Sequence, residues 1–181
     1  MDTMIRPTTH DRTSHTAAGR GPHYLMLGSV VVSTLLGGDD QTHDTLSLVE
    51  LVGAPGSGPG PHLDPWRESF YVLEGELTFR VEENGTVRSL VARRGDAVSI
   101  PQGVGHAFSV TSAAPARYLI ASSPAGIGAF FADAGEPIAQ AALPADAPPF
   151  DLDRLRAAFV KHRLTPYTFP GEPVPSAGCA G

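Results

Sequence analysis

Short apolar runs, separated by glycine or proline, dominate the chain from residue 24 to residue 123. The stretch LTFRV at 77–81 alternates apolar and polar side chains, which is typical of a strand with one buried face. The dipeptide Asn84-Gly85 that follows is a strong signal for a two-residue hairpin. Comparable strand-like runs lie at 28–36, 45–52, 69–92, 92–101, 103–111 and 116–122. This pattern predicts an all-β sandwich or barrel.

The pattern changes after Pro124. The segment at 125–138, AGIGAFFADAGEPI, has room for a short helix. Residues 151–163 predict an amphipathic helix whose first turn contains Asp151 and which Pro166 ends. Its apolar face is expected to pack on the barrel or on a second subunit, and consists of Leu152, Leu155, Phe159 and Leu164.

The length of 181 residues suits one folded domain with irregular ends. We expect a mobile polar tail at 1–20, a barrel at 21–123, a helical segment at 124–165 and a loose tail at 166–181.

Composition narrows the choice of partners and of compartment. The formal charge is −6 and the Lys and Arg residues form no cluster, so nucleic acid is not an expected partner. The most apolar early stretch, 24–38, is shorter than the roughly 20 residues that a membrane helix needs. The single cysteine, Cys179, is compatible with a reducing compartment. We therefore expect a cytoplasmic protein with no nucleic-acid or membrane partner.

Two polar blocks interrupt the strand pattern. PHLDPWRESFYVLEG at 61–75 contains His62, Asp64 and Glu68, and GDAVSIPQGVGHAF at 95–108 contains His106. Their spacing resembles the two motifs of the cupin superfamily, G-x5-H-x-H-x3–4-E-x6-G and G-x5-P-x-G-x2-H-x3-N. The wider pattern is similar to single-domain cupins of the quercetin-dioxygenase-like group.

The resemblance implies a small jelly-roll barrel that holds a divalent metal inside, usually iron, manganese, nickel, copper or zinc. It also implies a homodimer, because cupin barrels commonly pair through edge strands and swapped termini.

Strand geometry supports grouping these residues independently. Positions two apart share a face of a strand, so His62 points the same way as Asp64, and His106 the same way as Phe108. If these faces line one barrel, two imidazoles and one or two carboxylates converge on an apolar cavity. Two histidines plus a carboxylate is the ligand set of non-haem iron oxygenases. The residues predicted to line this cavity are Trp66, Phe70, Phe108 and Val110.

Asp64 stands where the cupin motif has its second histidine, and three readings stay open. If Asp64 is a ligand, the set of two histidines and two carboxylates favours Mn²⁺ or Fe²⁺ over copper. If it is not, His62, Glu68 and His106 still form a facial triad. Without any metal, two neighbouring carboxyls raise one pKa, and Asp64 or Glu68 acts as a general acid or base.

These readings predict three functions. The first is a metal-dependent cupin dioxygenase or related oxidoreductase acting on an aromatic or polyketide-like molecule. The second is a non-oxidative isomerase, cyclase or epimerase of specialised metabolism that uses Asp64, Glu68 and His106 as acid and base groups. The third is a small-molecule binding protein without activity, since one barrel hosts many chemistries.

Overall fold

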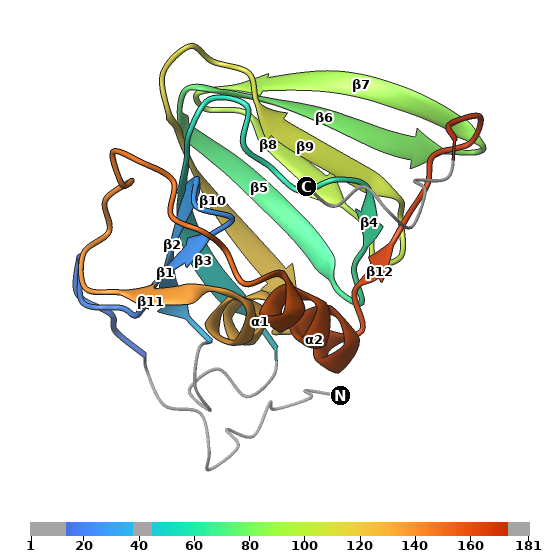
Figure 1. Cartoon of the computed structure of the whole chain (residues 1–181). Helices are drawn as coiled ribbons and strands as arrows, with labels where there is room; N and C mark the ends of the chain where they lie inside the picture. The colour runs from blue at the N-terminus through green and yellow to red at the C-terminus, as the bar shows by residue number, and fades with distance from the viewer. Residues whose placement is uncertain (1–13, 38–44, 174–181) are drawn as a thin grey trace, which may run out of the picture.

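Two antiparallel sheets face each other and form a jelly-roll barrel in the computed structural model, which describes residues 14–37 and 45–173 (Figure 1). One sheet has the strand order β11-β1-β2-β3-β10-β5-β8, and the other has the order β12-β4-β9-β6-β7. The all-β jelly-roll prediction is confirmed.

The larger sheet contains β1 (His23–Met26), β2 (Val30–Leu36), β3 (Ser47–Gly53), β5 (Arg67–Glu74), β8 (Ala97–Ile100), β10 (Ala116–Ser123) and β11 (Glu136–Ile138). The smaller sheet contains β4 (His62–Leu63), β6 (Glu76–Glu83), β7 (Thr86–Arg93), β9 (His106–Val110) and β12 (Thr165–Pro166).

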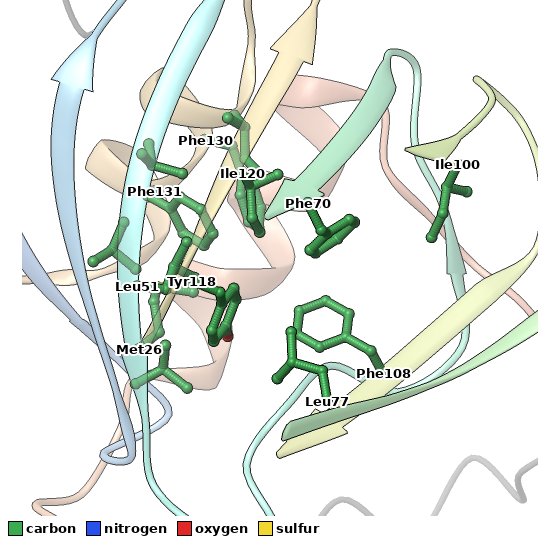
Figure 2. Packing of buried hydrophobic residues seen from close by; sticks show 14 of the residues in the cluster. Met26, Leu51, Phe70, Leu77, Ile100, Phe108, Tyr118, Ile120, Phe130 and Phe131 are labelled. Carbon is green, nitrogen blue, oxygen red and sulfur yellow. The ribbon is translucent and has the colours of Figure 1, made fainter. Parts of the chain in front are cut away.

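The core lies between the two sheets because alternate side chains of each strand point inward. Along β5, Phe70 is buried whereas its neighbour Tyr71 is exposed. The Phe70 ring packs edge-on against Phe79 and Phe108, at centroid distances of 4.9 and 5.1 Å (Figure 2). Phe108 in turn meets the buried ring of Tyr118. This aromatic cluster joins the two sheets beneath the polar site described below.

The predicted hairpin is confirmed. β6 pairs with β7 along its whole length, from Glu76 opposite Arg93 to Glu83 opposite Thr86. Asn84 and Gly85 have φ angles of 53° and 78°, and positive φ at both central residues is what a type I′ turn requires.

Two helices, α1 (Ile127–Ala134) and α2 (Leu152–His162), lie side by side at one end of the barrel (Figure 1). The Asp151 carboxylate caps α2 by accepting hydrogen bonds from the backbone N–H groups of Asp153 and Arg154. Both predicted helices are confirmed, but Pro166 does not end the second one. Arg163 ends it by adopting the left-handed conformation, with φ of 60°.

The sheets continue beyond residue 123, where strands were not expected. β11 pairs with β1, and β12 pairs with β4, which places Pro166 opposite His62. Phe169 is buried beneath the guanidinium of Arg80. Pro166 and Phe169, in the expected C-terminal tail at 166–181, therefore lie against the barrel.

The ends of the expected tails lie partly outside the described residues. These include residues 1–13 and Cys179. Of the expected N-terminal tail, Thr16 donates a hydrogen bond from its hydroxyl to the carbonyl of Leu35. Within the ranges that the structure describes, no helix is long and apolar enough to cross a membrane.

Candidate metal centre

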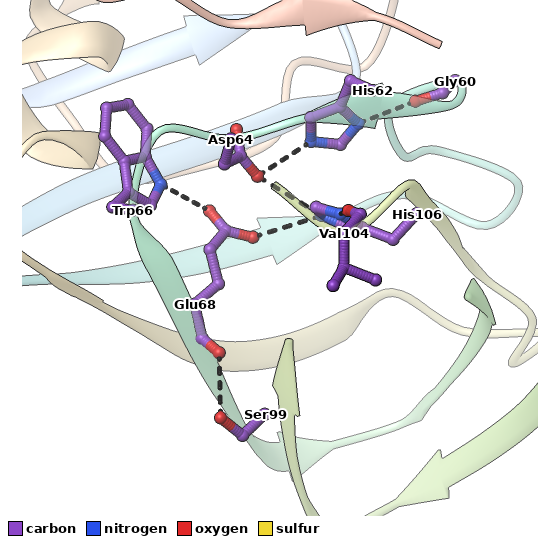
Figure 3. A network of polar contacts seen from close by, with 8 residues as sticks. All are labelled: Gly60, His62, Asp64, Trp66, Glu68, Ser99, Val104 and His106. Carbon is purple, nitrogen blue, oxygen red and sulfur yellow. Dashed lines mark hydrogen bonds and ion pairs between the residues drawn. The ribbon is translucent and has the colours of Figure 1, made fainter. Parts of the chain in front are cut away.

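Four polar side chains from three strands and one connection meet inside the barrel. His62 comes from β4, Glu68 from β5 and His106 from β9, while Asp64 lies between β4 and β5. Cross-strand pairing sets His62 directly opposite His106, and their ring centroids are 4.3 Å apart. The structure therefore brings together all four residues proposed from the sequence (Figure 3).

Each imidazole is held through its Nδ1 atom. His62 Nδ1 lies 2.9 Å from the carbonyl oxygen of Gly60, and His106 Nδ1 lies 3.0 Å from that of Val104. A carbonyl oxygen only accepts, so Nδ1 carries the proton in both rings. In the neutral rings, the Nε2 lone pairs are then left free toward the interior, as a metal-binding histidine needs.

The carboxylates approach the two Nε2 atoms. Asp64 Oδ2 lies 3.4 Å from Nε2 of His62 and 3.4 Å from Nε2 of His106. Glu68 Oε2 lies 3.5 Å from His106 Nε2, and its other oxygen accepts a 3.3 Å hydrogen bond from the Trp66 indole. All four polar residues are buried, with at most 7% of their surface exposed.

The arrangement leaves two buried atoms unsatisfied. Among the described residues, Asp64 Oδ2 and His106 Nε2 are the buried side-chain atoms without a hydrogen-bond partner. Such a group typically costs about 1–3 kcal/mol. The ligand atoms of His62, Asp64 and His106 all lie within 4.8 Å of one another. One cation between them would satisfy both unpartnered atoms, so this donor set fits a metal ion.

The pKa shifts of Glu68 and His62 also favour a cation at this site. Burial raises the pKa of Glu68, and the charge of Asp64 raises it further, against the opposing effect of His106. Burial disfavours the charged form of His62, but the nearby carboxylates of Asp64 and Glu68 and the Gly60 carbonyl together outweigh it and raise the pKa of His62. The site therefore attracts positive charge, either as protons or as a metal ion.

A cavity of about 550 Å³ opens beside the site, between the barrel and the two helices. His62, Asp64 and Glu68 form its polar edge. Its apolar walls include Trp66, Phe108 and Tyr118 from the barrel, Ile127 and Phe130 from α1, and Leu155 and Phe159 from α2.

Two of the four predicted pocket residues, Trp66 and Phe108, line this cavity. Phe70 and Val110 are buried in the core and are not among its lining residues, because the ring of Phe108 lies against Phe70 and Val110 packs near Gly53. The place of the helix residues in the cavity wall was not predicted from the sequence. The apolar face of 151–163 was the available signal. It predicts that the face is buried, but it does not identify the surface against which the face packs.

Comparison with known proteins agrees with the fold. Residues 50–122 match the cupin domain family Cupin_2, and this range includes both histidine-bearing segments. Whether the domain belongs to the quercetin-dioxygenase-like group stays a prediction.

Curated relatives match a similar part of the chain. The 3-hydroxyanthranilate 3,4-dioxygenase of Bos taurus is 36% identical over 64 residues, which are 35% of this chain and 22% of that relative. The enzyme of the same name from Xanthomonas campestris is 34% identical over 59 residues, 33% of this chain and 34% of the relative. The chain thus spans only a fifth to a third of the length of these relatives.

Solved structures share the fold at low sequence identity. Oxalate decarboxylase from Bacillus subtilis superposes with a TM-score of 0.51 at 14% identity, covering 61% of this chain and 31% of that one. An RmlC-like cupin from Shewanella frigidimarina gives 0.50 at 19% identity, covering 65% and 96%.

Proposed function

We propose that the chain is a metal-dependent cupin dioxygenase that acts on a small aromatic molecule, with His62, Asp64, Glu68 and His106 as its metal site. The observation that carries this proposal is the pair of buried, unpartnered atoms, Asp64 Oδ2 and His106 Nε2, beside an apolar cavity. The names of the curated relatives support oxygenase chemistry on an aromatic ring.

When bound, Fe²⁺ or Mn²⁺ would supply Lewis acidity and redox chemistry toward O₂. The residues of the chain prepare the site for it. The carbonyls of Gly60 and Val104 hold both imidazoles in the tautomer that presents Nε2. Two carboxylates balance the charge of a dication, and the Trp66 indole orients Glu68. The apolar walls exclude water from the reacting molecule.

Glu68 is also suited to move a proton. Its carboxyl is buried, its pKa is raised, and it lies at the cavity edge. A carboxyl of this kind accepts a proton from a phenolic hydroxyl more readily than an ordinary one. The same property favours a second candidate function, a non-oxidative isomerase, cyclase or epimerase in which Glu68 transfers protons and no O₂ is consumed.

Oxygen consumption distinguishes the dioxygenase from the non-oxidative enzyme. The protein is loaded with Fe²⁺ and incubated with aromatic phenols and aminophenols, and O₂ uptake and product are quantified together. A dioxygenase inserts both atoms of O₂, so uptake should equal product formed. Turnover that continues without O₂ would instead support the non-oxidative reaction.

A matched pair of variants controls this experiment. His106→Ala should abolish O₂ uptake, whereas His23→Ala should retain it, because His23 pairs with Ser33 away from the site. If both variants behave alike, the assignment of the site is wrong.

Pairing into a homodimer is part of the proposal and rests on the resemblance to cupins. Light scattering on the purified protein tests it directly, and a mass of one chain would contradict it.

A further inference from the structure

We infer that this cavity takes an uncharged, multi-ring phenol without a carboxylate, unlike the hydroxyanthranilate named in the curated relatives. This inference rests on the proposed function, which it makes more specific. Four features carry it: the cavity wall, the placement of the basic residues, the charge balance of the polar site, and the size of the cavity.

The cavity wall offers an anion no cationic partner. Among the described residues that line it there is no Lys or Arg. Its ionisable side chains are His62, Asp64 and Glu68 at the polar edge and Tyr118 on the barrel wall. Burial and the charge of Glu68 raise the pKa of Tyr118, so this group stays a neutral phenol. A substrate carboxylate placed here would be desolvated without compensation.

Three basic residues of α2 are paired with groups outside the cavity. α2 places Leu155 and Phe159 on the cavity wall and carries three cations that pair away from it. Arg154 binds Glu136 and the carbonyls of Ala132 and Asp133, Arg156 pairs with Asp153, and Lys161 pairs with Asp133.

The polar site, once it holds a dication, has no net positive charge that could bind an anionic substrate. With neutral imidazoles, the carboxylates of Asp64 and Glu68 balance the charge of a bound dication. An anionic substrate would then add net negative charge to a buried site, which is costly in a low-dielectric interior. A neutral phenol avoids this penalty, and its hydroxyl is the one polar group that the edge of the cavity can satisfy.

Cavity size sets the class of ring system. A volume of about 550 Å³ falls within the roughly 300–1,000 Å³ of pockets that hold drug-sized ligands. The aromatic walls of Trp66, Phe108 and Phe130 suit flat rings. We therefore expect two or more rings to bind better than one.

Binding of matched probes to the zinc-loaded protein tests the inference, because zinc is redox-inert and no turnover is needed. The pairs are 2-naphthol with 3-hydroxy-2-naphthoate, and 2-aminophenol with 3-hydroxyanthranilate, and calorimetry measures each dissociation constant. The neutral member should bind at least about 10-fold tighter in both pairs, and 2-naphthol tighter than 2-aminophenol. Equal or tighter binding of the carboxylates would overturn the inference.

A variant that supplies the missing cation sharpens the test. Leu155→Arg should raise the affinity for 3-hydroxy-2-naphthoate relative to 2-naphthol by about 10-fold, whereas the neutral control Leu155→Gln should not. Leu27→Arg is the second choice if the first variant fails to fold, because Leu27 lines the cavity and is 43% exposed. If neither arginine shifts the preference, the inference is wrong.

Two further results would distinguish a failure of the substrate inference from a failure of the proposed dioxygenase function. Arg6 and Arg12 lie outside the described residues, so loss of carboxylate binding in Arg6→Gln or Arg12→Gln would show that the chain supplies a cation and would overturn the inference. Probe binding that follows the predicted order without any O₂ uptake by the Fe²⁺-loaded protein would support the substrate class while contradicting the proposed dioxygenase.

Discussion

Asp64 occupies the position of a cupin histidine, and its surroundings favour the role of a metal ligand. Its Oδ2 atom lies 3.4 Å from both Nε2 atoms and has no hydrogen-bond partner among the described residues. A shorter side chain in place of imidazole still reaches the two histidines.

Asp64→Asn tests this role. Asparagine keeps the shape but loses the charge, so metal affinity should fall by at least the roughly 10- to 100-fold that the loss of an outer-sphere partner costs. Chelator competition against the wild-type protein measures it, with Asp153→Asn on α2 as a control that leaves the affinity unchanged. Full metal affinity with lost turnover would instead assign Asp64 to proton transfer.

Gly126→Ala tests the support behind Glu68. An added Cβ would lie 2.4 Å from Cε3 of Trp66, the residue whose indole holds Glu68. We expect Trp66 to shift, with a stability loss of about 1–3 kcal/mol from overpacking. Because Trp66 is the single tryptophan of the chain, its fluorescence reports the shift directly. The control is Gly60→Ala, whose added Cβ meets no atom within 4 Å. An unchanged spectrum in Gly126→Ala would contradict the packing described.

At the scale of elements, the carboxylate of Asp133 helps to hold α1 and α2 together. Asp133 at the end of α1 accepts hydrogen bonds from Lys161 and His162 at the end of α2. The hydrogen bond from Lys161, followed by that from His162, lowers the pKa of Asp133 below its ordinary value of 3.8. Since these helices form one wall of the cavity, this contact positions the wall.

The lowered pKa of Asp133 determines how the contribution of this carboxylate to folding stability varies with pH. A carboxyl whose pKa is depressed in the folded state stabilises the fold fully above its unfolded-state value and loses that effect as the pH falls through the folded-state value. Asp133→Asn should therefore lower the free energy of unfolding by about 0.5–1 kcal/mol at neutral pH, because the pair is partly exposed to solvent. The difference from wild type should be full well above pH 3.8 and should shrink as the pH falls below 3.8 through the lowered folded-state value.

Urea unfolding at a series of pH values measures this difference. Asp153→Asn is the control, because Asp153 is highly exposed and pairs only within α2. A difference that grows toward low pH would contradict the assignment.

Elements with a strong period were predictable, and elements fixed by tertiary pairing were not. The alternation in β5 and β6 and the Asn84-Gly85 turn identified the central strands. β12, in contrast, has only two residues and exists because Thr165 pairs with Leu63 across the sheet. The end of α2 was misplaced at Pro166 because a left-handed arginine gives no sequence signal comparable to glycine or proline.

At the scale of the whole molecule, the jelly roll explains why the site was easier to predict than the cavity. Motif spacing identified His62 and His106, and the barrel closes so that their strands pair directly. The cavity depends on where the C-terminal helices rest, which no local pattern specifies. An amphipathic face containing Leu155 and Phe159 predicts burial but not the partner surface.

The metal content of protein purified without chelator tests the central claim most directly, with the same measurement after chelation and reloading. The described site predicts about one equivalent of a divalent transition metal per chain, reduced to near zero by His106→Ala and retained by His23→Ala. Less than about a tenth of an equivalent in the wild-type protein, with no rebinding on reloading, would contradict it.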